Sequence, residues 1–207
     1  MFALRPQRTL FPNSGLCKPQ SEKVCFVVIV KKLDPTPAPQ LCEKAASSTS
    51  YARSAFGHGW DDADGDCQNS RAEALIETSN TTARFATDKE CRVVTGRWLS
   101  PFTGKVIQNS SEIDIDHVVP LKWAWKRGAK IWAQAKRERF ANDMLNLWPV
   151  ELSLNRSKGD HGPDEWLPPS GKCGYVARFW RIVNQYDLQP SEPEARWITS
   201  FLHGCRS

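Results

Sequence analysis

This chain of 207 residues has neither a long apolar run nor a Cys-x-x-Cys pair. The stretch VCFVVIV, residues 24–30, is the longest apolar run, and it is far shorter than the ~18 residues that a bilayer-spanning helix needs. None of the seven cysteines forms a Cys-x-x-Cys pair, which argues against a zinc ribbon. Internal repeats are also absent. A membrane span is therefore not expected, and the 40% of apolar residues fits an ordinary globular domain.

The N-terminal fifth of the chain differs from the rest in composition. Basic residues precede the short apolar run at 24–30, and three prolines follow in DPTPAPQ, residues 34–40. The apolar run is compatible with a weak export signal, with a wrongly assigned start or with a short strand. We predict a leader or linker at residues 1–44 and a single working domain at residues 45–207. If the apolar run is an export signal, the protein is expected to be secreted or periplasmic.

Hydrophobic periodicity predicts a mixed α+β domain. Alternation in SEIDIDHVV indicates a half-buried strand, and Pro149 in NLWPVEL limits the second strand to a sheet edge. NRSKGD, which follows, is expected to turn. A small antiparallel element thus lies among helices. The helices are predicted at 70–79, capped by Ser70, and at 133–144, 174–186 and 191–204, and a strand hairpin at 91–108.

Positive charge is concentrated in one segment. The formal net charge is only +5, but residues 122–139 hold seven Lys and Arg against the single acidic residue Glu138. Such a run is usually a solvated helix face. It can also bind a polyanion such as nucleic acid, with strong salt dependence and little sequence preference.

The chain places one of its four histidines beside an aspartate, at the end of the predicted strand. Adjacent strand residues point to opposite faces, so Asp116 and His117 can serve one site only where the strand ends. An ionised aspartate is a hard ligand for Mg²⁺, and a neutral histidine can take a proton from water. Downstream, Asn146 and Asn155 offer amide groups that can ligate a cation or fix a loop.

The segments DIDHVVPL and NDMLNLWPVELSLNRSKGD resemble HNH nucleases of the ββα-metal class, and are most similar to bacterial nuclease-like proteins that are often exported. GDCQNSR (65–71), GRWLSPFTG (96–104), FANDMLNL (140–147) and NRSKGDHGPDEWLPP (155–169) extend the resemblance to about residues 57–205. A single motif of this kind is weak, whereas the ordered set is strong.

This resemblance implies a role for each matching residue. His117 would be the general base, Asp116 and Asn155 would hold one divalent cation, Mg²⁺ or else Mn²⁺ or another ion, and Asn146 would fix the loop behind His117. His161 is a rival metal ligand. Asp66 and Arg71 belong to a matching motif to which the resemblance assigns no chemistry, and we interpret them as a supporting salt bridge. The residues expected to bind the nucleic-acid backbone are Lys122, Lys126, Arg127, Arg156 and Lys158.

Cysteine pairing is left open by spacing alone, because Cys67 and Cys91 or Cys173 and Cys205 could equally be buried thiols. The resemblance favours the disulfides Cys67–Cys91 and Cys173–Cys205. The acidic run 61–66 is similar to a calcium loop, but Cys67 stands where that loop needs glycine, so a solvated acidic turn is the better interpretation.

Two functions remain in competition at this point. The first is a metal-dependent endonuclease that cuts DNA, with RNA as a further candidate substrate, without sequence preference. The second is a non-catalytic nucleic-acid-binding or surface-interaction module on the same scaffold. No sequence feature indicates a protein partner.

Overall fold

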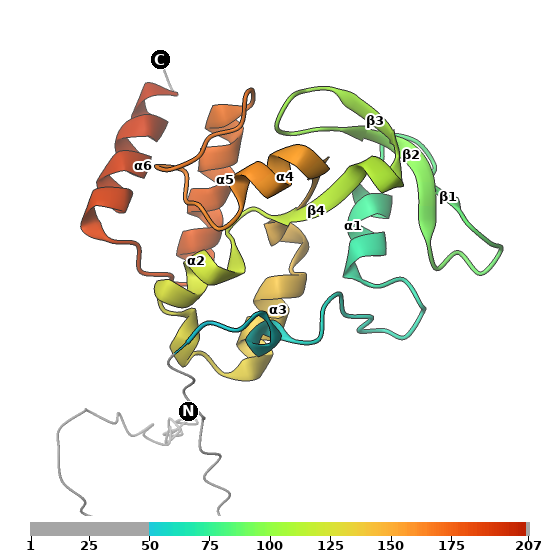
Figure 1. Cartoon of the computed structure of the whole chain (residues 1–207), viewed down its shortest axis with the longest axis horizontal. Helices are drawn as coiled ribbons and strands as arrows, with labels where there is room; N and C mark the ends of the chain where they lie inside the picture. Colours follow the sequence, from blue (N-terminus) through green and yellow to red (C-terminus); the bar gives the residue numbers. More distant parts are fainter. Residues whose placement is uncertain (1–49, 206–207) are drawn as a thin grey trace, which may run out of the picture. The chain divides into compact units, whose positions relative to one another are not determined.

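The structure, a computed structural model, describes residues 50–205, so the predicted leader lies outside the described residues. The described part is a mixed α+β domain with two small antiparallel sheets among helices (Figure 1). No helix within it is long and apolar enough to cross a membrane. The strands are β1 (Arg84–Phe85), β2 (Val93–Leu99), β3 (Val106–Asn109), β4 (Ile113–His117) and β5 (Leu147–Glu151).

The helices differ from prediction mainly at their ends. Asn69, not Ser70, caps the first helix by accepting a hydrogen bond from the Ala72 amide, while the Ser70 hydroxyl donates to Asn142. The predicted turn NRSKGD lies largely within a helix, α4, which ends at Lys158. The helices are α1 (Ser70–Thr78), α2 (Leu121–Lys126), α3 (Gln134–Asn142), α4 (Leu152–Lys158), α5 (Lys172–Gln185) and α6 (Glu192–Gly204), with short 3₁₀ turns η1 (Arg53–Phe56), η2 (Ser110–Glu112), η3 (Ala129–Ile131) and η4 (Met144–Asn146).

Two apolar clusters hold the domain together. The larger forms around α5, whose buried residues recur at three- and four-residue spacing and so lie on one helix face. Trp123 and Trp125 belong to it, with 2% and 5% of their surface exposed, so their rings pack in the core. The smaller cluster joins α1 to both sheets, where the Trp98 indole donates to the Leu75 carbonyl at 2.7 Å.

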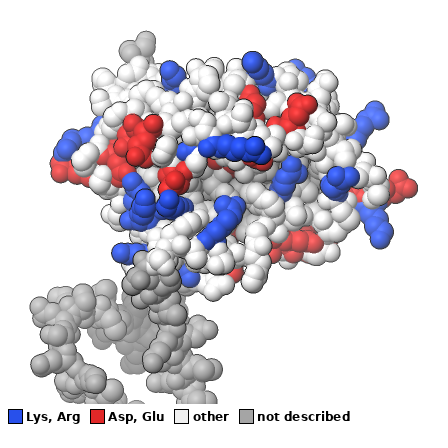
Figure 2. Space-filling view, viewed as in Figure 1, with Lys and Arg blue, Asp and Glu red and all other residues white. Residues whose placement is uncertain are grey.

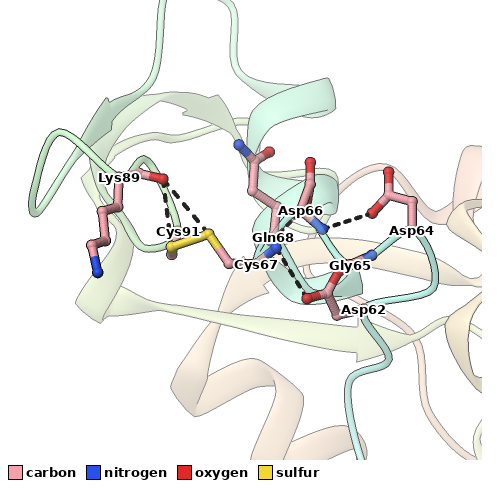
Figure 3. The surroundings of a disulfide bond; sticks show 8 residues. All are labelled: Asp62, Asp64, Gly65, Asp66, Cys67, Gln68, Lys89 and Cys91. Atoms are coloured by element: carbon pink, nitrogen blue, oxygen red, sulfur yellow. Dashed lines mark hydrogen bonds between the residues drawn. A yellow bond between two sulfur atoms is a disulfide. The ribbon is translucent and has the colours of Figure 1, made fainter.

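Disulfides join Cys67 to Cys91 and Cys173 to Cys205, as the resemblance implies. The first lies beside the acidic run (Figure 3), where Asp62 accepts the amides of Gly65 and Cys67. Asp62, Asp64 and Asp66 are all exposed. Backbone hydrogen bonds explain their placement, which agrees with a solvated acidic turn.

Candidate functional site

β4 and β5 pair antiparallel over five residues and form the floor of the candidate site. Asp116 lies opposite Trp148, and His117 lies opposite Leu147. The isoleucines of β4 face the smaller core, as the alternating pattern predicts. α4 follows β5 directly and contacts both strands, so the order of elements is strand, strand, helix.

Asn146 fixes the chain where it leaves β4. Its side chain is fully buried, its Oδ1 accepts the Val119 amide at 2.8 Å, and its Nδ2 donates to the carbonyls of Val119 and Phe140 at 3.3 and 3.4 Å. Its own carbonyl accepts the Val118 amide at 2.9 Å. Three of these hydrogen bonds hold the backbone at Val118 and Val119, immediately after His117, and the fourth joins it to Phe140 of α3.

The His117 imidazole is held in one tautomer. Its Nε2 lies 2.8 Å from the Ala141 carbonyl, and a carbonyl can only accept, so Nε2 carries the proton and Nδ1 is left with a free lone pair. The Trp60 ring stacks on the imidazole with centroids 5.4 Å apart and planes 13° apart. The ring is therefore oriented by a hydrogen bond at its edge and a stacked indole on its face.

Burial keeps this imidazole neutral. His117 is 8% exposed, and burial, with smaller contributions from the positive charges of Arg53 and Lys158, lowers its pKa to about 3. The hydrogen bond to Ala141 opposes the shift. The imidazole is thus unprotonated at neutral pH, as a general base must be, although a pKa this far below neutrality makes Nδ1 a weak base.

Asp116 is paired with a lysine inside the protein. The Lys158 ammonium, which is fully buried, donates to Asp116 Oδ1 and to the His117 carbonyl, each at 2.8 Å. Burial raises the pKa of Asp116 and lowers that of Lys158, while their mutual attraction opposes both shifts. The Lys158 ammonium, which the sequence predicts to contact phosphate, is directed into the protein in this arrangement.

Asn155 lies near the same strand but bonds a different carboxylate. Its Nδ2 donates to Asp114 Oδ2 at 3.2 Å. Asp114 and Asp116 are two residues apart on β4 and share one side of the strand. The sequence interpretation paired Asn155 with Asp116 and did not consider Asp114, which alternates in the strand like any solvent-facing residue.

A cavity of about 310 Å³ brings the central predicted residues together. Asp116, His117 and Asn155 line it, as does Lys122. His161 is exposed and does not line this cavity. The remaining lining residues are Tyr51, Arg53, Ile115, Pro120, Leu121, Gly159 and Asp160.

The predicted backbone-binding cations are spread out and mostly engaged. Lys122 forms an ion pair with Asp160 at 2.8 Å, and Arg127 binds Glu194 and stacks on the Trp123 ring. Lys126 and Arg156 are exposed but do not line the cavity. Figure 2 shows basic and acidic side chains interspersed on the face viewed, so this face carries no continuous cationic surface.

The predicted supporting salt bridge between Asp66 and Arg71 is not present. Asp66 is exposed and accepts the Gln68 amide at 2.7 Å. Arg71 instead donates to the carbonyls of Ser110 and Ile113, at 3.1 and 3.2 Å, where the chain enters β4. Its hydrogen bonds therefore support the start of the strand that carries Asp116 and His117.

Three residues at the site were missed from the sequence: Tyr51, Arg53 and Trp60. Tyr51 and Arg53 line the main cavity, and Arg53 and Trp60 line a smaller adjoining one that also touches His117. They lie more than fifty positions before His117, and no local pattern connects such distant segments.

Comparison with known proteins identifies the family of this chain. Residues 67–195 match the family described as GmrSD restriction endonucleases, C-terminal domain. The chain belongs to this family. GmrSD C-terminal domains are HNH-type nucleases, so the expected resemblance is confirmed at the level of the family, and membership indicates a nuclease-like function on nucleic acid.

A relative of this GmrSD-type chain occurs in Arthroderma benhamiae. It is named "Uncharacterized secreted protein", and it is 38% identical over 159 residues, which cover 75% of this chain and 76% of the relative. No solved structure matches the chain.

Proposed function

We propose that the protein is a divalent-cation-dependent endonuclease that hydrolyses phosphodiester bonds in DNA with little sequence preference, with RNA as a further candidate substrate. In this proposal β4, β5 and α4 are a ββα-metal core. The observation that carries it is the His117 imidazole, whose Nε2 proton is committed to the Ala141 carbonyl so that Nδ1 can accept a proton from water.

The residues present are compatible with a hard divalent cation. Asp116 Oδ2 is a buried oxygen with no hydrogen-bond donor, and Asn155 keeps its Oδ1 free of any hydrogen bond to residues 50–205 while Nδ2 binds Asp114. Lys158 holds the other oxygen of Asp116 and favours its ionised form. Carboxylate and amide oxygens suit Mg²⁺ or Mn²⁺.

In the proposed reaction, each of these side chains has a separate task. A bound Mg²⁺ or Mn²⁺ ion supplies charge neutralisation at the scissile phosphate. His117 accepts the proton of the attacking water at Nδ1. Trp60 and the Ala141 carbonyl keep the imidazole in its orientation, and Asn146 fixes the backbone behind it.

An extracellular or periplasmic location is part of the proposal. Two disulfides are typical of oxidising compartments, and the fungal relative carries the word secreted in its name. Mass spectrometry of the mature protein would check this by giving its first residue and its number of free thiols.

A plasmid-nicking assay tests the activity. The wild-type protein should cut with Mg²⁺ or Mn²⁺ and lose all cleavage in EDTA. His117→Ala should lower the rate about 10²- to 10⁴-fold, as expected for loss of a general base, and should still bind Mn²⁺. His203→Ala, which changes an exposed histidine on α6, is the matched control.

The non-catalytic alternative is supported by the buried ion pair, because Lys158 already occupies one oxygen of the proposed metal ligand Asp116. The same assay tests this alternative. A protein that retards DNA in a gel but does not cut it with any divalent cation would be a binding module. Asn155→Ala should weaken Mn²⁺ binding measured by calorimetry if Asn155 is a ligand.

A further inference from the structure

Most cations near His117 are already engaged. Lys158 is buried against Asp116, and Lys122 is paired with Asp160. A phosphate entering the main cavity would have to compete with a carboxylate for Lys122, and it cannot reach the buried Lys158 ammonium in this arrangement. Besides the divalent cation proposed above, an anionic backbone would therefore need a side-chain cation other than Lys122 and Lys158 to bind here.

Arg53 is that cation. It lines both the main cavity and the smaller one, so it adjoins His117 from two sides. It is exposed, and it makes no hydrogen bond or ion pair with any residue between 50 and 205. Of the two cations that line the main cavity within residues 50–205, Lys122 is paired with Asp160, whereas Arg53 has no acidic partner.

The backbone that carries Arg53 is held firmly. Phe56, at the end of η1, is 2% exposed and packs with ring centroids 6.2 Å from both Trp125 and Phe140. Arg137 Nε donates to the Ala55 carbonyl at 2.7 Å. η1 is thus anchored to the core on one side and presents Arg53 to the cavity on the other.

The chemistry of the site favours phosphate as the partner of this arginine. A guanidinium offers a planar set of donors that matches phosphate oxygens, and bonds of this kind are among the stronger ones in proteins.

We propose that Arg53 binds a phosphate oxygen of the nucleic-acid backbone beside His117. The segment 51–60, which precedes the family-matched residues 67–195, thereby completes the substrate-binding site. This inference rests on the proposed nuclease function for the identity of the ligand, but it concerns binding and can be measured without cleavage.

The experiment is fluorescence anisotropy with a labelled short DNA duplex in EDTA. Arg53→Ala should raise Kd about tenfold to a hundredfold at low salt and should reduce the slope of log K against log salt by about 0.9, the value for one lost phosphate contact. The Kd of Arg53→Lys should lie between those of the wild type and Arg53→Ala. Arg84→Ala, which removes an exposed arginine from β1, should behave as wild type.

The two proposals fail in different ways. If Arg53→Ala binds DNA as tightly as Arg84→Ala, with an unchanged salt slope, the inference about Arg53 is overturned, even for a protein that cuts DNA. If the wild-type protein never cuts but Arg53→Ala loses affinity, the nuclease function is wrong and the inference stands. Thermal unfolding of both variants should match wild type, because both side chains are exposed.

Discussion

The ammonium of Lys158 lies 2.8 Å from Asp116 Oδ1, and both side chains are almost entirely shielded from solvent. The pair joins the end of α4 to the end of β4, next to the cavity that Asp116 and His117 line. A buried ion pair is weak evidence of net stabilisation, yet removing one partner leaves an uncompensated group in the interior.

Lys158→Met should therefore lower the free energy of unfolding by about 3–5 kcal/mol. The substitution removes the ammonium, so the Asp116 carboxylate and the His117 carbonyl both lose their hydrogen-bond donor. Urea denaturation measures the change. Arg156→Met, two residues earlier on the same helix but exposed, should alter stability by no more than about 0.5 kcal/mol. Equal effects at the two positions would contradict the buried pair.

Trp60→Ala should lower kcat about 10- to 100-fold while KM changes little, because the stacked indole orients the imidazole and does not contribute charge to the cavity. Trp60→Phe keeps an aromatic face on His117 and should recover most of the rate. Steady-state cleavage of a fluorogenic oligonucleotide gives both constants. A loss confined to KM would mean that Trp60 contacts the substrate and not the histidine.

Asn146→Ala should destabilise the domain by about 1–3 kcal/mol, since the buried Val119 amide loses its acceptor. Asn146→Asp restores that acceptor but places a carboxylate against the carbonyls of Val119 and Phe140, so it should be no better than alanine at neutral pH. Chemical denaturation compares the two. A stable, wild-type-like aspartate variant would show that Nδ2 donation is unimportant.

The Arg127–Glu194 pair should make a pH-dependent contribution to stability. Burial raises the pKa of Glu194, but hydrogen bonds from Arg127 and Ser191 outweigh it and leave the pKa below its ordinary value. A carboxyl group with a depressed folded-state pKa stabilises above its unfolded pKa, about 4.3, and that contribution disappears as the pH falls through the folded value.

Glu194→Gln isolates this charge, because glutamine can still complete the capping box with Ser191. The variant should melt below wild type at pH 7, and the difference should shrink below about pH 4. Calorimetry across this range measures it. A difference that does not change with pH would assign the effect to packing.

Local pattern predicted the strand that carries Asp116 and His117, because alternation is a property of adjacent residues. The helices α5 and α6 were predicted from another local pattern, the three- and four-residue spacing of their apolar side chains. α4 was mistaken for a turn because NRSKGD contains residues typical of loops, whereas contacts with β4 and β5 favour a helix there.

The environment of the site could not be read from local pattern. Lys158 resembles a surface lysine until its partner on β4 is known, and Asp114 resembles a solvent-facing strand residue until Asn155 lies beside it. The contributions of Arg53 and Trp60 depend on tertiary contacts with a segment far along the chain. The resemblance supplied the two disulfides, which spacing alone left undecided.

The antiparallel pairing of β4 with β5 joins His117 to Leu147, thirty positions later, and the intervening chain includes α2 and α3. Closing this loop costs conformational entropy that only the contacts between the two strands repay. A newly made chain would thus have no cutting centre until this long-range pairing is complete. In the nuclease proposed above, a chain that has not yet folded would therefore be unable to cut nucleic acid.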